Sequence, residues 1–142
     1  MCGIFGYIGS KRATPILIDG MRRLEYRGYD STGIAVKDGD ISIFKKVGKV
    51  SEMRSILPLN IQGTSGIGHT RWATHGGVTD ANAHPHASAS GDVVIVHNGI
   101  INNSRLLRAS LMAQGIELKS ETDSEALAHM IEIELAIDDD PE

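Results

Sequence analysis

The chain opens with Met1-Cys2-Gly3-Ile4-Phe5-Gly6-Tyr7-Ile8-Gly9, a short apolar run in which every third residue is glycine. Such a run is typical of a β-strand, and we expect one from Cys2 to Ile8. Glycine within a strand also lets another backbone or a ligand approach closely. The sequence therefore predicts that the amino terminus belongs to the folded interior.

A helix and a hairpin follow this strand in the predicted order of elements. Thr14-Pro15 suits the N-cap and first position of a helix, which is expected to stop at Arg27-Gly28. The pair Asp38-Gly39 then separates two strand-like runs at 33–37 and 41–46. An Asp-Gly pair between such runs is a strong hairpin signal, so two antiparallel strands are predicted.

The rest of the chain predicts further helices and strands around one long loop. The expected elements are a helix at 51–57, a strand at 67–71, a loop at 72–92, a fully apolar strand at 93–97, and helices at 104–114 and from Thr122 or Asp123 onward. The last helix is expected to carry an apolar stripe formed by Leu127, Met130, Ile131 and Leu135. Loops this long are often binding loops or lids, so 72–92 is a candidate functional segment.

Composition indicates an ordinary folded domain and excludes several partners. The 142 residues are 41% hydrophobic and carry a net charge of −4, without a long basic cluster, so nucleic acid is not an expected partner. No apolar run approaches the roughly 20 residues of a membrane helix, and no signal region is evident, so we expect a cytoplasmic protein and no membrane partner. The single cysteine excludes an intrachain disulfide and directs attention to a free thiol.

Cys2 combines two reactive groups if Met1 is removed. Its thiol would then be a nucleophile and its own α-amine a base, because the amine has a neutral fraction near pH 7. The alternative is a small buried cysteine that packs as an apolar side chain.

Six motifs along the chain resemble those of the class-II glutamine amidotransferases. They are Met1-Cys2-Gly3-Ile4-Phe5-Gly6, Arg22 to Ser31, Gly68 to Gly76, Asn82-Ala83-His84-Pro85-His86, His97 to Asn103, and Ser120 to Glu125. They occur in the family's order from end to end. The forms Glu-Tyr-Arg-Gly-Tyr-Asp at 25–30 and Arg-Trp-Ala-Thr-His-Gly at 71–76 are similar to the branch that aminates fructose 6-phosphate. Amidophosphoribosyltransferases, the alternative branch, usually carry different residues there.

The resemblance implies the fold and the domain organisation. The family adopts an α+β sandwich of the N-terminal-nucleophile type, in which two antiparallel sheets lie between helical layers. Residues 1–142 correspond to only part of this glutaminase domain, so we expect the sandwich to be incomplete at the carboxyl end. Sugar isomerase domains are expected as partners, and a homo-oligomer is expected, only in the full-length protein. No cofactor is implied.

The resemblance also implies the catalytic groups. Cys2 would attack the side-chain amide of L-glutamine, and Asn98 with Gly99 would form the oxyanion hole. The alternative for Asn98-Gly99 is a simple tight turn.

Recognition of free glutamine requires a cation for its α-carboxylate and an anion for its α-ammonium. Arg71 and Asp123 suit these two tasks, with Thr74 and His75 adding hydrogen bonds near the carboxylate. Asp123 would alternatively cap a helix, and Arg71 would alternatively form a surface ion pair.

Trp72 is expected among the substrate-binding residues, and three further residues receive supporting roles. The resemblance implies that Trp72 lies on a lid over glutamine and gates the passage of ammonia, whereas core packing is its alternative. Arg27 and Tyr29 are similar to positions that brace the nucleophile, although a helix-end cation and a packed ring are equally compatible. His84 is placed with them as a supporting residue.

Other functions are weighed against the glutaminase. The six histidines, and His84-Pro85-His86 above all, suggest a metal site as an alternative, although we predict none. A second alternative is a catalytically idle piece that binds glutamine without turnover. The ammonia acceptor lies outside what these residues indicate.

Overall fold

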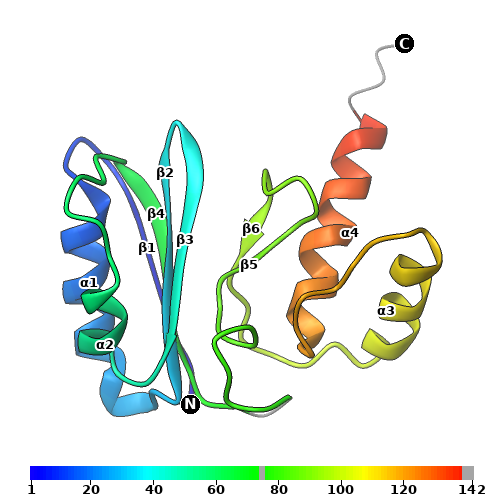
Figure 1. The fold of residues 1–142 in the computed structure, drawn as a ribbon, viewed down its shortest axis with the longest axis horizontal. Helices are drawn as coiled ribbons and strands as arrows, with labels where there is room; N and C mark the ends of the chain where they lie inside the picture. Colours follow the sequence, from blue (N-terminus) through cyan, green and yellow to red (C-terminus); the bar gives the residue numbers. More distant parts are fainter. Residues whose placement is uncertain (74–75, 139–142) are drawn as a thin grey trace.

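Helices and sheets follow one another in four layers in the computed structural model, which describes residues 1–73 and 76–138 (Figure 1). One outer layer holds α1 (Ala13–Leu24) and α2 (Val50–Ser55). The first sheet is antiparallel, in the order β1 (Gly3–Ile8), β4 (Ser65–Arg71), β2 (Ser31–Asp38) and β3 (Asp40–Val47). A second sheet pairs β5 (His86–Ala87) with β6 (Val94–Ile95), and α3 (Ser104–Ala113) and α4 (Asp123–Asp138) form the other outer layer. This order of layers confirms the predicted α+β sandwich.

Strand pairing places the amino terminus beside the end of β4. β1 pairs with β4 so that Gly3 lies opposite Thr70, and β4 pairs with β2 on its other side. Cys2, immediately before β1, therefore lies next to Arg71, the last residue of β4. The sequence predicts both strands, with boundaries that shift by one or two residues.

A core of apolar side chains fills the space between the first sheet and its helices. Leu17 and Met21 of α1, Ile34 of β2, and Val50 and Met53 of α2 are fully buried. Burial of this apolar surface attaches α1 and α2 to one face of the sheet, which leaves the other face for the second sheet.

Two glycines end elements as the sequence predicts. Gly39, at φ +73°, forms the turn between β2 and β3. After α1 the chain makes a 3-10 turn, Glu25–Arg27, and Gly28 at φ +137° donates its N–H to the carbonyl of Glu25 at 3.0 Å. Residues with side chains rarely adopt such angles, so both positions favour glycine.

The start of α1 differs from the prediction. The helix begins at Ala13, so Thr14 lies inside the first turn, where it is buried and does not cap the helix. The Ala13 N–H donates to the carbonyl of Gly63 at 2.8 Å, and the Arg12 side chain donates to the carbonyl of Ile61 at 3.1 Å. Contacts with a distant segment therefore set where this helix begins.

The second sheet is shorter than predicted. The strand expected at 93–97 is reduced to β6, and residues 93–96 are half-buried rather than buried. β5 lies within the expected loop at 72–92. Among the described residues, β6 pairs only with the two residues of β5. Few backbone hydrogen bonds are therefore present to lengthen β6.

α4 buries a different face from the predicted stripe. Of that stripe, three residues are half-buried and one is exposed: Leu127, Met130 and Ile131, and then Leu135. The helix packs against α3, β5 and β6, and its buried residues include Ala126, Ala128 and His129. The buried carboxylate of Glu125 accepts the N–H groups of Lys119 and Ser120 at 2.6 and 2.8 Å, which turns a polar face of the helix inward.

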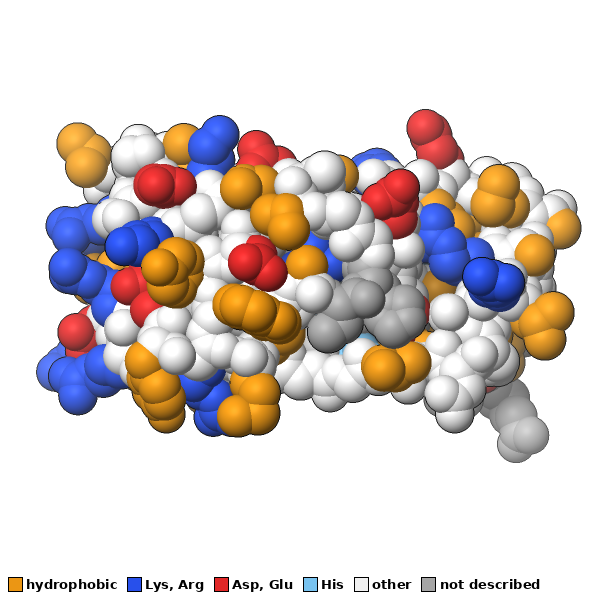
Figure 2. All heavy atoms as spheres, turned by 90° about the horizontal axis from the view of Figure 1, so that it is seen from below, with side chains coloured by type: hydrophobic (Ala, Val, Ile, Leu, Met, Phe, Trp, Pro, Cys, Tyr) orange, Lys and Arg blue, Asp and Glu red, His pale blue; other side chains and the backbone are white. Residues whose placement is uncertain are grey.

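Basic side chains gather over the outer face of α1 and α2 (Figure 2). Arg12, Arg22 and Arg54 line a hollow of about 300 Å³ there, together with Asp19. Positive charge is therefore concentrated on this face although the net charge is −4.

Gly33 of β2 allows the segment before β5 to pack closely against the first sheet. A Cβ atom at Gly33 would lie 2.1 Å from the carbonyl oxygen of His84, so only glycine permits this approach. His84 is thereby held against the sheet.

No helix within residues 1–73 and 76–138 is long and apolar enough to cross a lipid bilayer.

Candidate active site

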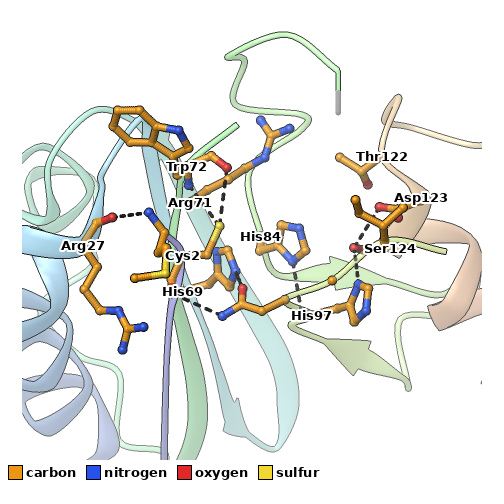
Figure 3. A pocket seen from close by; sticks show the side chains of 14 residues that line it. Cys2, Arg27, His69, Arg71, Trp72, His84, His97, Thr122, Asp123 and Ser124 are labelled. Carbon is orange, nitrogen blue, oxygen red and sulfur yellow. Dashed lines mark hydrogen bonds between the residues drawn. The ribbon is translucent and has the colours of Figure 1, made fainter. Parts of the chain in front are cut away.

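A cavity of about 520 Å³ opens beside the amino terminus (Figure 3). Its lining comes from six separate places: the start of the chain, the 3-10 turn after α1, the end of β4, the segment before β5, the segment after β6, and the start of α4. The predicted site residues that line it are Cys2, Arg27, Arg71, Trp72, His84, Asn98, Gly99 and Asp123. Thr74 and His75, which the sequence also predicts, lie outside the described residues.

The Cys2 sulfur lies at this cavity and is held by the backbone of β4's end. The N–H of Trp72 donates to the Cys2 Sγ at 3.1 Å. The amino group of Met1 donates to the carbonyl of Arg27. With Met1 present, the nitrogen of Cys2 is a peptide amide and carries no basic lone pair.

Asn98 and Gly99 follow β6 and line the same cavity as Cys2. The Asn98 Nδ2 lies 3.4 Å from the carbonyl oxygen of Cys2, and its Oδ1 lies 2.8 Å from the Nε2 of His69. Gly99 has φ +157°, and a Cβ atom there would lie 2.8 Å from the Nε2 of His97. The Asn98 amide is therefore held at both its oxygen and its nitrogen, and the pair could present an amide N–H and a backbone N–H to one oxygen.

Arg71 and Asp123 place opposite charges around the same cavity. Arg71 is only 4% exposed, and its Nη1 donates to the carbonyl of Gly77 at 3.0 Å, so it is not a surface ion pair. Burial lowers the pKa of Arg71, while the nearby Cys2, Asp30 and Asp123 act in the opposite direction. A cation and an anion lining one cavity suit a zwitterionic ligand.

Asp123 begins α4, and its side chain has a partner of its own. The Asp123 Oδ2 accepts the N–H of Ile101 at 2.8 Å. The N-cap role falls to Thr122, whose Oγ1 accepts the N–H of Glu125 at 3.4 Å. The choice between Thr122 and Asp123 as the helix cap is thus settled in favour of Thr122.

Trp72 marks the point where the chain leaves the first sheet. Its side chain is 53% exposed, so core packing is not its role. It packs on Gly28, where a Cβ atom would lie 2.8 Å from the Trp72 Cε3. Ala73, the residue after Trp72, is held by Asp30, whose Oδ2 accepts the N–H of Ala73 at 2.8 Å.

Tyr29 is the predicted residue that the structure does not bring to the cavity. Its ring is 43% exposed, and the Nζ of Lys49 lies 5.2 Å from the ring centroid. Arg27, in contrast, lines the cavity, and its carbonyl oxygen accepts a hydrogen bond from the Met1 amine.

Three histidines form a buried cluster, and two of them, His69 and His84, line the cavity. The rings of His69 and His84 are stacked with centroids 4.2 Å apart, and His86 lies edge-on to His84 at 4.5 Å. Burial lowers the pKa of His69 to about 4 and that of His86 to about 3, and it lowers the pKa of His84 further. All three rings are therefore neutral at pH 7. Within the described part of the chain, no group of three or more His, Cys, Asp or Glu side chains is arranged to hold a metal ion.

Sequence reasoning missed several residues that line the cavity: Met1, His69, His97, Ile100, Thr122 and Ser124. One signal could have found His69. Alternate residues of a strand share a face, so His69 and Arg71 of β4 point to the same side of the sheet. The contact between His97 Nδ1 and Ser124 Oγ, at 3.0 Å, has no comparable sequence signal.

Comparisons with known proteins show the family to which this chain belongs. A model of the family described as "Glutamine amidotransferase domain" matches residues 58–134. Glutamine–fructose-6-phosphate aminotransferase [isomerizing] of Chlorobaculum tepidum is 51% identical over 138 residues, covering 93% of this chain and 22% of the relative. The enzyme of the same name from Pyrococcus horikoshii is 50% identical over 139 residues, covering 96% and 23%. The chain thus spans less than a quarter of the length of these curated relatives.

Two solved structures share the fold. The glutamine phosphoribosylpyrophosphate amidotransferase from B. subtilis, complexed with ADP and GMP, matches with a TM-score of 0.76 at 28% identity. A structure described as the allosteric regulatory enzyme of purine biosynthesis matches with a TM-score of 0.79 at 31% identity. Each match covers 93% of this chain and 29% of the other. With the family match and the sandwich fold together, the chain belongs to the class-II, N-terminal-nucleophile family of glutamine amidotransferases.

Proposed function

We propose that this chain hydrolyses L-glutamine to glutamate and ammonia, as the amide-donor half of glucosamine 6-phosphate synthesis from fructose 6-phosphate. One observation carries the proposal: Cys2, Asn98, Arg71 and Asp123 come from four chain segments and line a single cavity. A nucleophile, an oxyanion donor and two opposite charges are the groups that cleavage of a free amino acid's side-chain amide requires.

The chemistry begins at Cys2 after removal of Met1. The freed α-amine takes the thiol proton, and the thiolate attacks the side-chain amide carbon of glutamine. As the C–S bond forms, the Asn98 amide and the Gly99 N–H donate to the oxyanion. The C–N bond then breaks, and the proton on the amine leaves with ammonia. Water next attacks the thioester, giving its proton to the amine, and glutamate leaves as the thiol is restored.

Selectivity for glutamine follows from the charges. Arg71 would bind the α-carboxylate, with Thr74 and His75 adding hydrogen bonds, and Asp123 would bind the α-ammonium. Trp72 would lie on a lid that covers the bound substrate and directs ammonia onward. Arg27, Tyr29 and His84 would support these groups, Arg27 through its position against the amino terminus.

The fructose 6-phosphate acceptor rests on the relatives. Their printed name, and identities of about 50% against 28–31% for the amidotransferases of known structure, favour this branch over an amidophosphoribosyltransferase. Fructose 6-phosphate would be bound by a sugar isomerase domain, which the part of the relatives beyond this match has room to contain.

A second candidate is a glutamine-binding protein without turnover. It applies where Met1 is retained, because the nitrogen of Cys2 is then a peptide amide and not a free amine. In that state the charges around the cavity could hold glutamine while no base accepts the thiol proton.

The test measures the intact mass of the purified chain before and after incubation with a glutamine-like diazo-ketone electrophile. Loss of Met1, together with one adduct that excess glutamine prevents, supports the glutaminase. Cys2→Ala is the control and should take no adduct while still binding glutamine. Retention of Met1 with glutamine binding but no adduct would favour the second candidate, and absence of glutamine binding would contradict both.

A further inference from the structure

His69 contacts the proposed oxyanion donor from inside the protein. It lies in β4, its side chain is 1% exposed, and its Nε2 is 2.8 Å from the Asn98 Oδ1 (Figure 3). We propose that His69 is a positioning residue that fixes which way the Asn98 amide points, so that an N–H rather than an oxygen faces the Cys2 sulfur. This inference rests on the proposed function.

The chemistry of the two side chains sets the direction of this hydrogen bond. The Asn98 Oδ1 is an acceptor only, so the Nε2 of His69 must carry the hydrogen. A neutral ring with its proton on Nδ1 would instead accept from the Asn98 Nδ2, and the amide would turn by half a rotation. The Oδ1 would then face the cavity, where an oxygen would repel the oxyanion that the reaction forms. The position of one ring proton therefore selects between a working and a failing oxyanion hole.

A second contact selects the same orientation of the amide. The Asn98 Nδ2 lies 3.4 Å from the carbonyl oxygen of Cys2. In the turned amide, two oxygens would face each other at this place, and neither could donate. The Cys2 carbonyl, at the amide nitrogen, and the His69 Nε2, at the amide oxygen, thus favour the same orientation of the Asn98 side chain.

The histidine cluster holds the His69 ring in place. His84 is stacked on it with an angle of 17° between the rings, and the Nδ1 of His84 accepts the N–H of His97 at 3.4 Å. Because His97 directly precedes Asn98, the same segment that carries the amide also anchors the stacked ring. The Nδ1 of His69 itself has no hydrogen-bond partner among the described residues. Stacking on His84 therefore helps to fix the ring plane.

Burial keeps this donor uncharged. The surroundings lower the pKa of His69 to about 4, mainly through desolvation, with the charges of Arg71 and His97 acting in the same direction and the Asn98 side chain and the His97 backbone opposing them. A neutral donor orients the amide without placing a positive charge behind the nucleophile.

Loss of the donor should act on the chemical step. Removal of an oxyanion donor typically lowers the rate by 10²–10³. An amide that turns freely still donates part of the time, so loss of His69 should lower kcat by about tenfold or more, and less than loss of Asn98 does. KM for glutamine should change little, because the oxyanion exists only after attack.

The test uses two substitutions of similar polarity. In His69→Gln the longer side chain carries its amide nitrogen to the position of Nε2 and can donate to Asn98, whereas His69→Asn is too short. We expect kcat to be restored toward the original value in the Gln variant and lowered about tenfold or more in the Asn variant. In an Asn98→Ala background the two should agree within about twofold, because nothing remains to be oriented. Thermal unfolding of each variant checks that it folds.

A purely structural role of His69 predicts a different pattern. The Gln and Asn variants would then lose equal amounts of kcat, and these losses would persist in the Asn98→Ala background. That pattern would overturn the inference.

A measurement independent of turnover separates the failure of this inference from the failure of the proposed function. The ¹⁵N chemical shifts of the ring nitrogens, assigned to His69 by comparison with the Gln variant, should show the proton on Nε2. A proton on Nδ1 would refute the inference even in an active protein, and an inert protein with the proton on Nε2 would count against the proposed function alone.

Discussion

The buried histidine cluster should make the protein lose stability on mild acidification. An unfolded histidine has a pKa near 6.5, whereas burial lowers the pKa of His69 to about 4 and that of His86 to about 3. Between these values the unfolded chain binds more protons than the folded one, so stability is fully present above pH 6.5 and falls as the pH decreases through this window. At pH 5 the loss is about 2 kcal/mol for each of the two rings, and His84 acts in the same direction. Total stabilities are commonly about 5–15 kcal/mol, so the effect is large.

Urea unfolding at pH 7, 6 and 5, at constant ionic strength and followed by circular dichroism, measures this loss. His69→Gln removes one titrating ring and should reduce the difference between pH 7 and pH 5 by about 2 kcal/mol. A free energy of unfolding that changes by less than about 1 kcal/mol over this range would refute the reasoning. So would a loss confined to pH values below about 4.5, where carboxyl groups rather than histidines take up protons.

Three further predictions concern single residues. Asn98→Ala should lower kcat by about 10²–10³ in a protein that still folds, and an equal kcat in a steady-state ammonia-release assay would exclude it as the oxyanion donor. Asp123→Asn keeps an oxygen for its backbone partner but loses the charge, so kcat/KM for glutamine should fall about tenfold or more, mainly through KM; unchanged kinetics would show that another group binds the ammonium. Gly33→Ala places a methyl group against the His84 carbonyl and should lower the free energy of unfolding by about 1–3 kcal/mol, whereas Gly6→Ala, with nothing within 4 Å, should not; similar values for the two would contradict the close approach.

The elements that sequence predicts well are those whose signals are local. Gly39 and Gly28 adopt the positive φ angles that make glycine a stop signal, and the hairpin and the end of the first helical segment follow from them. The start of α1 depends instead on hydrogen bonds from Arg12 and Ala13 to a segment near residue 62. Local sequence around Thr14 cannot reveal these contacts, and so the predicted cap is wrong.

Burial of polar groups limits prediction in the second layer. An apolar stripe describes a helix that buries only apolar side chains, yet α4 turns Glu125 and His129 inward, where Glu125 replaces missing backbone partners of the preceding turn. The site shows the same limit. Motifs indicate Asn98 and Arg71 individually, but the hydrogen bond that links His69 to Asn98 depends on the packing of two sheets against each other. Its geometry is a tertiary property.

The position of the amino terminus has a practical consequence for work with this protein. Met1 lines the cavity, whereas α4 runs away from it toward the opposite end of the molecule (Figure 1). An affinity tag, fluorescent fusion or surface tether on the first residue would therefore occupy the substrate entrance. Attachment at the far end of α4 would keep the tether away from that entrance (Figure 1).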